Sequence, residues 1–151
     1  MTKLKNQITN YFLKPHRANI EILSNDYPGY FSNVLKKFDI KLNTDENIHQ
    51  LIAWDDIEHV HTFFCDYEGS DKEVSAWLRK SDLNDSQFLI IELGYELPII
   101  KVECQVFMEN WEDFVAASGY TGITVIDENG RFYMEFVDEG KNLFSNFKIQ
   151  D

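Results

Sequence analysis

The sequence predicts a single α+β domain, in which a mainly antiparallel sheet of about five strands packs against three to five helices. Helical periodicity dominates the first half of the chain, whereas the densest apolar segments and the hairpin turns come late, between Phe88 and Phe136. A chain of 151 residues can bury about two thirds of its unfolded surface. No repeat, low-complexity run or linker interrupts residues 1–151, so we expect one domain.

The N-terminal part of the chain predicts two helices with a short strand between them. Apolar residues recur at helical spacing over residues 3–13, a segment that Pro15 closes, and again over residues 30–38. Residues 19–23 suggest a short strand. The sequence Asn-Asp-Tyr-Pro-Gly at residues 25–29 predicts a turn that leads into the second helix.

The middle of the chain is predicted to hold two more helices and a strand. Thr44 is a candidate N-cap followed by two acidic residues, which predicts a helix through Ile52. A strand over residues 48–54 is the competing interpretation. The run at residues 60–65 has strand character, and residues 70–80 carry an amphipathic pattern that predicts a helix.

Two apolar segments, residues 88–93 and 98–104, predict a pair of strands, the first of them buried on both faces. Pro98 is tolerated because the first position of a strand needs no ladder donor. Cys104 falls within the second segment and Cys65 within the strand at residues 60–65. We expect both thiols to be reduced and buried, although strand neighbours could form a bridge on oxidation.

The C-terminal part predicts a helix, a hairpin and a last strand. Apolar side chains at helical spacing follow Asn110, and Gly119 is expected to end this helix in the left-handed conformation. The strands at residues 123–126 and 131–137 flank an Asn-Gly pair, whose positive φ angles a tight hairpin requires. Residues 143–149 suggest a half-buried strand at the sheet edge.

Charge is distributed unevenly along the chain. Residues 1–41 have seven basic and three acidic side chains, a net charge of +4, and residues 42–151 have seven and twenty-three, a net charge of −16. Such a field repels nucleic acid and anionic lipid and attracts a basic partner. We therefore expect no direct nucleic-acid or membrane binding. Because no segment resembles a signal peptide or a membrane span, we also expect a soluble, cytoplasmic protein.

The most acidic stretch, residues 55–73, has seven carboxylates against one lysine, and we call it the acidic tract. One interpretation is a solvated face that maintains solubility. Nearby aromatic residues favour the other, a surface that binds a basic partner, since Trp and Tyr often anchor interfaces. The predicted partner-binding residues are Trp54, Asp55, Asp56, Glu58, Asp66, Tyr67, Glu68, Asp71 and Glu73.

Enzymatic alternatives start from His59 and His61, which share a strand face and lie near His49, Asp55 and Asp56 in the sequence. Two such histidines could bind one metal ion, but a His-x-His pair is common and no second spaced pair accompanies it. Neither cysteine has a catalytic context, and the glycines form no phosphate-binding loop. We therefore expect a protein without a cofactor or metal and without enzymatic activity.

In size, charge and general character, with the segments IEHVHTFFCDY at residues 57–67 and FYMEF at residues 132–136, the chain resembles immunity proteins of bacterial toxin systems such as contact-dependent growth inhibition. The resemblance implies a cytoplasmic, non-enzymatic inhibitor that binds one toxin domain, often a basic nuclease, and covers its active site. The alternatives are a small metal- or histidine-dependent enzyme that uses His59 and His61, and an acidic regulatory or assembly subunit.

Overall fold

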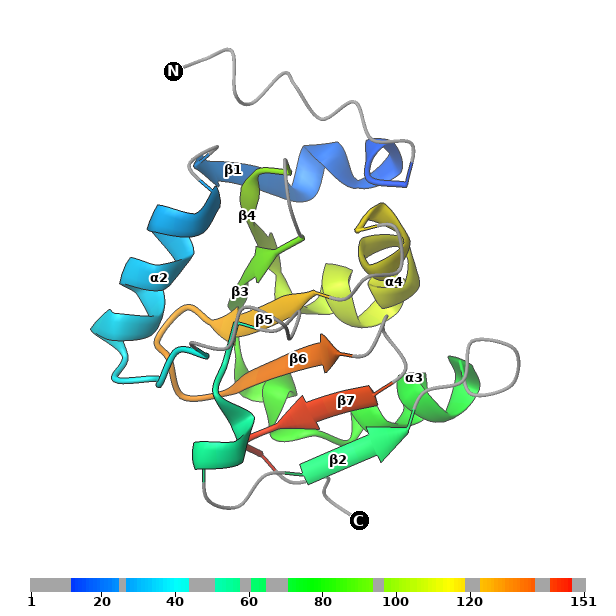
Figure 1. The fold of residues 1–151 in the computed structure, drawn as a ribbon. Coiled ribbons are helices and arrows are strands. Elements are labelled where there is room, and N and C mark those ends of the chain that lie inside the picture. Colours follow the sequence, from blue (N-terminus) through cyan, green and yellow to red (C-terminus); the bar gives the residue numbers. More distant parts are fainter. Residues whose placement is uncertain are drawn as a thin grey trace.

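The computed structural model describes residues 12–24, 27–43, 51–57, 61–64, 71–93, 97–118, 123–137 and 142–147. Its strands form one antiparallel sheet in the order β1-β4-β3-β5-β6-β7-β2 (Figure 1). The strands are β1 (Ile20–Ser24), β2 (His61–Phe64), β3 (Phe88–Glu92), β4 (Ile99–Glu103), β5 (Thr124–Asp127), β6 (Tyr133–Val137) and β7 (Asn142–Ser145). The helices are α2 (Tyr27–Lys37), α3 (Asp71–Arg79) and α4 (Cys104–Ala117), with 3₁₀ turns η1 (Lys14–Asn19), η2 (Trp54–Asp56) and η3 (Asp82–Asp85).

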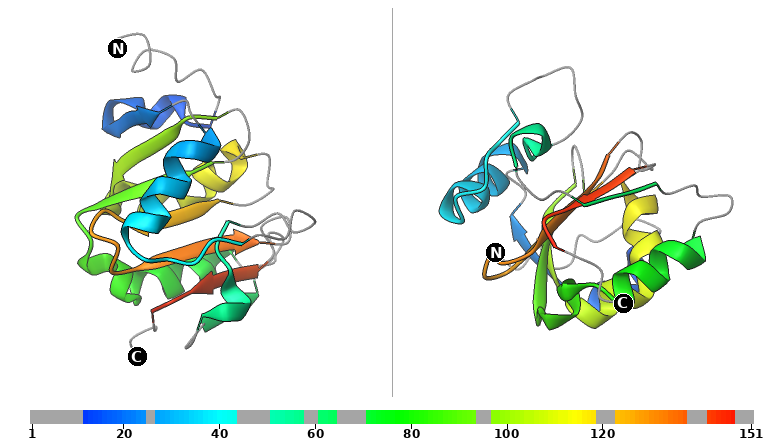
Figure 2. Two further views of the ribbon diagram at one scale, coloured as in Figure 1. Left: turned by 60° about the vertical axis from the view of Figure 1, so that its left-hand side comes forward. Right: turned by 90° about the horizontal axis from the view of Figure 1, so that it is seen from below.

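Helices cover both faces of the sheet. Figure 2 shows α2 and η2 on one face and α3 and α4 on the other. The sheet therefore separates a large core on the α3 and α4 side from a small core on the α2 side. Along β3, Leu89 and Ile91 point into the large core and Ile90 points into the small core. This arrangement explains why β3 has an almost continuous apolar sequence, as strands buried on both faces do.

The α+β prediction is confirmed, and the β3–β4 and β5–β6 hairpins form as expected. The sheet has seven strands rather than about five, because both short outer strands, β1 and β2, join it. β7 was expected at the sheet edge but lies between β6 and β2. Strand β2 pairs with β7 across almost eighty residues of sequence, and no local pattern indicates such a pairing.

Helix α4 begins at Cys104, six residues earlier than the sequence predicted. Asn110, the predicted start, is instead a kink with φ −135° and ψ 24°. Cys104 is therefore the first residue of a helix rather than the end of β4. The prediction was wrong because no glycine or proline separates the two elements, so that the apolar pattern of the strand continues into the helix.

Two further predictions are corrected, those for the turn at residues 25–29 and for the helix that was expected to reach Ile52. Pro15 lies at the start of η1, and the helix predicted over residues 3–13 falls almost entirely outside the described residues. Tyr27, Pro28 and Gly29 form the first turn of α2 rather than a loop, a position where proline is well tolerated. The helix predicted to reach Ile52 is wrong in its last residues, since Ile52 forms an antiparallel bridge with Leu42.

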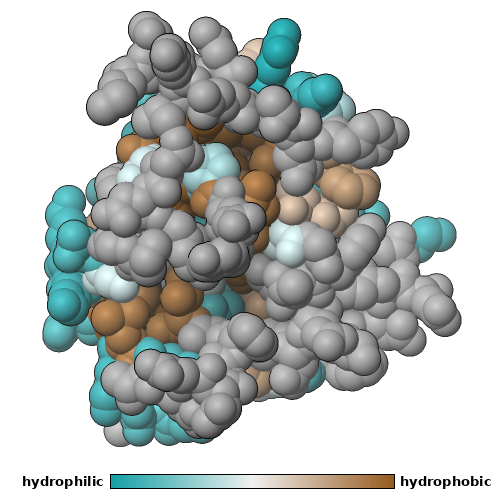
Figure 3. Space-filling view, turned by 45° about the horizontal axis from the view of Figure 1, so that its top comes forward, coloured by the Kyte–Doolittle hydropathy of each residue, from teal (hydrophilic) through white to brown (hydrophobic). Residues whose placement is uncertain are grey.

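The β5–β6 turn confirms the role of glycine but not that of asparagine. Of the Asn-Gly pair, only Gly130 has a positive φ, at 74°. The Asp127 carboxylate completes the turn by accepting hydrogen bonds from the backbone N–H groups of Asn129 and Arg131. The tip of this hairpin lies against Phe38, the residue that follows α2, with Gly130 next to the Phe38 side chain. Figure 3 shows hydrophilic residues at the margin of one face and apolar residues farther in.

Gly130→Ala is expected to lower the free energy of unfolding by more than about 1 kcal/mol, since an L-residue in the left-handed conformation costs about that much. The new methyl group would also overlap the Phe38 side chain. Chemical denaturation measures the loss, with Asn129→Ala as the control because Asn129 is exposed and in the same turn. Equal stability of the two variants would contradict this account of the turn.

Candidate functional site

The described carboxylates of the acidic tract lie on the two elements that flank the outer strand β2 in the chain. Asp55 and Asp56 are exposed on η2, which precedes β2, and Glu73 is exposed on α3, which follows it. Because η2 and α3 cover opposite faces of the sheet, these elements present their carboxylates on its two sides (Figure 2). They therefore do not form one flat patch. We call Asp55, Asp56 and Glu73, with β2 between them in the chain, the β2 acidic surface.

Not every predicted site residue can be placed in this way. Asp71 is the first residue of α3. The other members, Glu58, Asp66, Tyr67 and Glu68, lie outside the described residues. Of the histidines considered for a metal site, His49 and His59 also lie outside, and only the backbone of His61 is described, in β2.

Trp54 was expected to anchor a partner at the surface, and its position corrects that expectation. Its side chain is 3% exposed and belongs to the small core. The indole ring packs against Tyr133 on β6 and Phe144 on β7, with ring centroids 5.7 and 5.8 Å away. Burial of the large apolar surface of the indole is favourable, so the ring helps to hold η2 on the sheet. Trp54 is not part of the β2 acidic surface.

Asp56 has a cationic neighbour that the sequence did not reveal. The Nζ atom of Lys41 lies 3.2 Å from Oδ2 of Asp56. Both side chains are more than half exposed, and ion pairs of this kind add at most about 1 kcal/mol to stability. Asp56 can therefore exchange this lysine for a cation of a partner at little cost to the fold.

The residue that positions η2 was missed by the sequence analysis. Glu135 on β6 is 3% exposed and accepts four hydrogen bonds. The donors are the backbone N–H groups of Leu51 and Ile52 at 2.8 and 3.3 Å, the indole N–H of Trp54 at 2.8 Å and the Thr124 hydroxyl at 2.6 Å. Its sequence context resembles an outward-facing position, since Met134 and Phe136 on either side point into the large core. Glu135 is buried because residues 51–54 lie against it.

A row of polar residues crosses the sheet next to Glu135. Glu92, Thr124 and Glu135 are direct cross-strand neighbours on β3, β5 and β6, and each is less than 5% exposed. Burial raises the pKa of Glu135 above its ordinary value, and the four hydrogen bonds oppose this shift only in part. The hydrogen bonds of Glu135 connect the sheet to the segment above it, which indicates a structural anchor.

The raised pKa of Glu135 predicts an unusual pH dependence. A group whose pKa is higher in the folded state stabilises the fold below its unfolded pKa, and loses that contribution as pH rises through the folded pKa. The wild type is therefore expected to gain stability relative to Glu135→Gln as the pH falls toward the ordinary pKa of a glutamate. Urea denaturation of both proteins at each pH measures this difference. A difference that shrinks toward low pH would contradict the assignment.

Cys104 lacks the properties of a nucleophile. Its thiol is 2% exposed and donates a hydrogen bond to the carbonyl oxygen of Leu83 at 3.2 Å. Burial, followed by the negative charge of Asp127, raises the pKa of this thiol to about 11. A thiol with so high a pKa is protonated at neutral pH and reacts slowly. We assign Cys104 to the core.

The sequence matches no protein-family model and no curated protein. Within the described ranges, no cluster of three or more His, Cys, Asp or Glu side chains could bind a metal ion. Among the helices of those ranges, none is long and apolar enough to cross a membrane. The functional assignment therefore depends on charge, burial and strand order.

Proposed function

We propose that the protein is an immunity or antitoxin-type binding protein, which neutralises a cognate basic toxin, most simply a nuclease, by covering its active site with an acidic surface. The observation that carries the proposal is the exposure of Asp55, Asp56 and Glu73 on η2 and α3, the elements that flank β2 in the chain. These residues belong to the part of the chain with a net charge of −16. Carboxylates in this arrangement imitate the phosphates that a basic nuclease binds.

Electrostatics supports such a role in two ways. A strongly negative surface accelerates the encounter with a basic partner, by about 10- to 1000-fold for focused fields. At contact, a carboxylate that becomes desolvated against a partner Arg or Lys slows dissociation. The exposed pair of Asp56 with Lys41 is weak enough for a partner cation to replace the lysine.

Co-expression tests this proposal directly. An immunity protein is expected to protect cells from the product of a neighbouring, basic and toxic reading frame, and to elute with that product as one complex. Failure to protect against it, with no complex formed, would contradict the proposal. Turnover of a substrate that depends on His59 and His61 would favour the enzyme alternative, and a stable complex with a harmless basic protein would favour the assembly-subunit alternative.

A further inference from the structure

The segment that carries Asp55 and Asp56 is hydrogen-bonded to the sheet through the side chain of Glu135 and packs on it through the ring of Trp54. Three of the four donors to Glu135 come from residues 51–54, which are more than eighty positions away in the sequence. Oε2 accepts from Leu51 N–H, and Oε1 accepts from Ile52 N–H and from the Trp54 indole. The fourth donor, the hydroxyl of Thr124, holds the carboxylate from the neighbouring strand.

Backbone hydrogen bonds of this segment run to residues 41–43. The backbone N–H of Ala53 donates to Lys41, and that of Asn43 donates to Leu51, at 2.9 and 2.8 Å. These bonds join two adjacent stretches of chain to one another. The hydrogen bonds that Leu51, Ile52 and Trp54 donate to Glu135 connect the segment to the sheet.

The chemistry of these donors selects a carboxylate. An ionised carboxylate has only acceptor sites, about four of them, and here it faces four donors. An amide would bring hydrogens of its own into the group and oppose one of the donors. An apolar side chain would leave buried N–H groups without acceptors, at a cost of about 1 to 3 kcal/mol each.

We infer that Glu135 is the positioning residue of the β2 acidic surface, because its four hydrogen bonds fix the turn that presents Asp55 and Asp56. The positioning itself follows from the contacts above, whereas its effect on partner capture rests on the proposed function. Asp55 and Asp56 follow Trp54 directly in η2, so the carboxylates share the fixed geometry of residues 51–54. Preorganised groups bind without a further ordering cost.

Hydrogen exchange tests the positioning without any partner. In Glu135→Gln the amides of Leu51 and Ile52 and the indole N–H of Trp54 are expected to exchange about tenfold faster or more. The amides of Ile91 and Val102 in the sheet are expected to keep their wild-type rates. Unchanged rates at Leu51 and Ile52, or an equal acceleration at every amide, would overturn the inference.

Two further variants make the result specific. Asp127→Asn alters another fully buried carboxylate, whose bonds lie within its own hairpin, and it should leave exchange at residues 51–54 unchanged. Trp54→Phe keeps a ring but removes one donor to Glu135, and should accelerate exchange at Ile52 to a smaller extent. If Glu135→Gln does not fold, Trp54→Phe decides: wild-type exchange at Leu51 and Ile52 in that variant overturns the inference.

Capture of the toxin gives the functional readout. Asp55→Lys with Asp56→Lys should weaken binding to the purified toxin domain by a smaller factor in the Glu135→Gln background than in the wild type, because the two carboxylates are no longer fixed. An equal factor in both backgrounds would overturn the positioning role and leave the proposed function intact. Absence of binding by the wild type would contradict the proposed function, and the exchange rates would still decide whether Glu135 positions the turn.

Discussion

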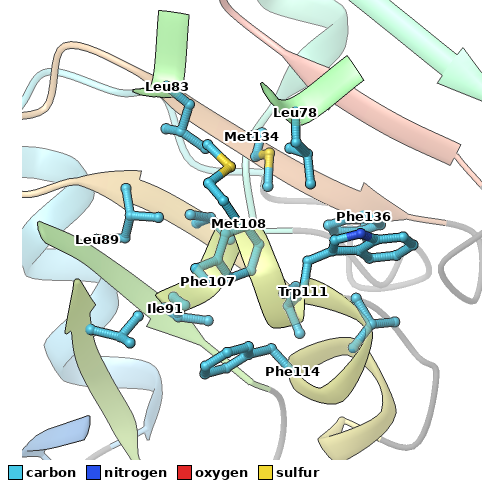
Figure 4. Packing of buried hydrophobic residues seen from close by; sticks show 14 of the residues in the cluster. Leu78, Leu83, Leu89, Ile91, Phe107, Met108, Trp111, Phe114, Met134 and Phe136 are labelled. Carbon is cyan, nitrogen blue, oxygen red and sulfur yellow. The ribbon is translucent and has the colours of Figure 1, made fainter. Parts of the chain in front are cut away.

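Phe114→Ala is expected to lower the free energy of unfolding by about 3 to 5 kcal/mol, the usual range for truncation of a buried phenylalanine. Phe114 is 0% exposed and belongs to the large core (Figure 4). Its ring lies 5.5 Å from that of Phe107, and the imidazole of His16 stacks on its other side at 5.8 Å. Truncation therefore leaves a cavity where α4, the sheet and η1 meet.

Urea denaturation measures this loss as a shift of the midpoint at unchanged slope. Glu109→Ala is the matched control, because Glu109 is exposed on the same helix and its truncation should cost less than about 0.5 kcal/mol. The truncation should also destabilise η1, because His16 of η1 stacks on Phe114 and pairs with Asp113 of α4 at 2.7 Å. A loss below about 1 kcal/mol for Phe114→Ala would show that α4 does not pack on the sheet as described.

Local patterns predicted most of the sheet. The β3 sequence is apolar at nearly every position because both of its faces are covered, and the β5–β6 hairpin needs a residue such as Gly130 that accepts a positive φ. Both signals lie within a few residues of the element they specify. Both signals can therefore be recognised without knowledge of the rest of the fold.

The errors arise where distant segments meet. Strands β2 and β7 pair although they are far apart in the sequence. Helix α2 and the turn η2, which cover one face of the sheet, are also distant in sequence from the central strands (Figure 2). The strand predicted over residues 98–104 took in Cys104, the first residue of α4, and the predicted helix began only at Asn110, the kink where the side-chain amide donates to the Val106 carbonyl oxygen. Local periodicity carries no information about such contacts.

The candidate site was predicted only in part for the same reason. Asp55, Asp56 and Glu73 are exposed, as their charge predicts. Charged side chains are exposed in any solvated segment, so this agreement does not identify a binding surface. Trp54 was expected at the surface but is buried, and Glu135, which the sequence analysis missed, is also buried and accepts a hydrogen bond from the Trp54 indole. A buried acidic residue in a strand is recognisable from sequence only when the layer that covers it is known.

The largest effect on function is expected from reversing charge on the β2 acidic surface. A variant with Asp55→Lys, Asp56→Lys and Glu73→Lys should associate with the toxin domain about 10- to 1000-fold more slowly at low salt. The difference should shrink as added salt shortens the Debye length from about 10 Å at 0.1 M to about 3 Å at 1 M. The melting temperature should hardly change, because all three side chains are exposed.

The most direct test compares this variant with one that has the same net charge. Glu21→Lys, Glu103→Lys and Glu109→Lys reverse three exposed carboxylates on β1, β4 and α4, and β1 and β4 lie at the opposite end of the sheet from β2. Survival of cells that co-express the toxin with each triple variant is the measurement. The account predicts survival with the β1, β4 and α4 variant and death with the β2 variant. Equal protection by both, or loss of protection with the β1, β4 and α4 variant alone, would contradict it.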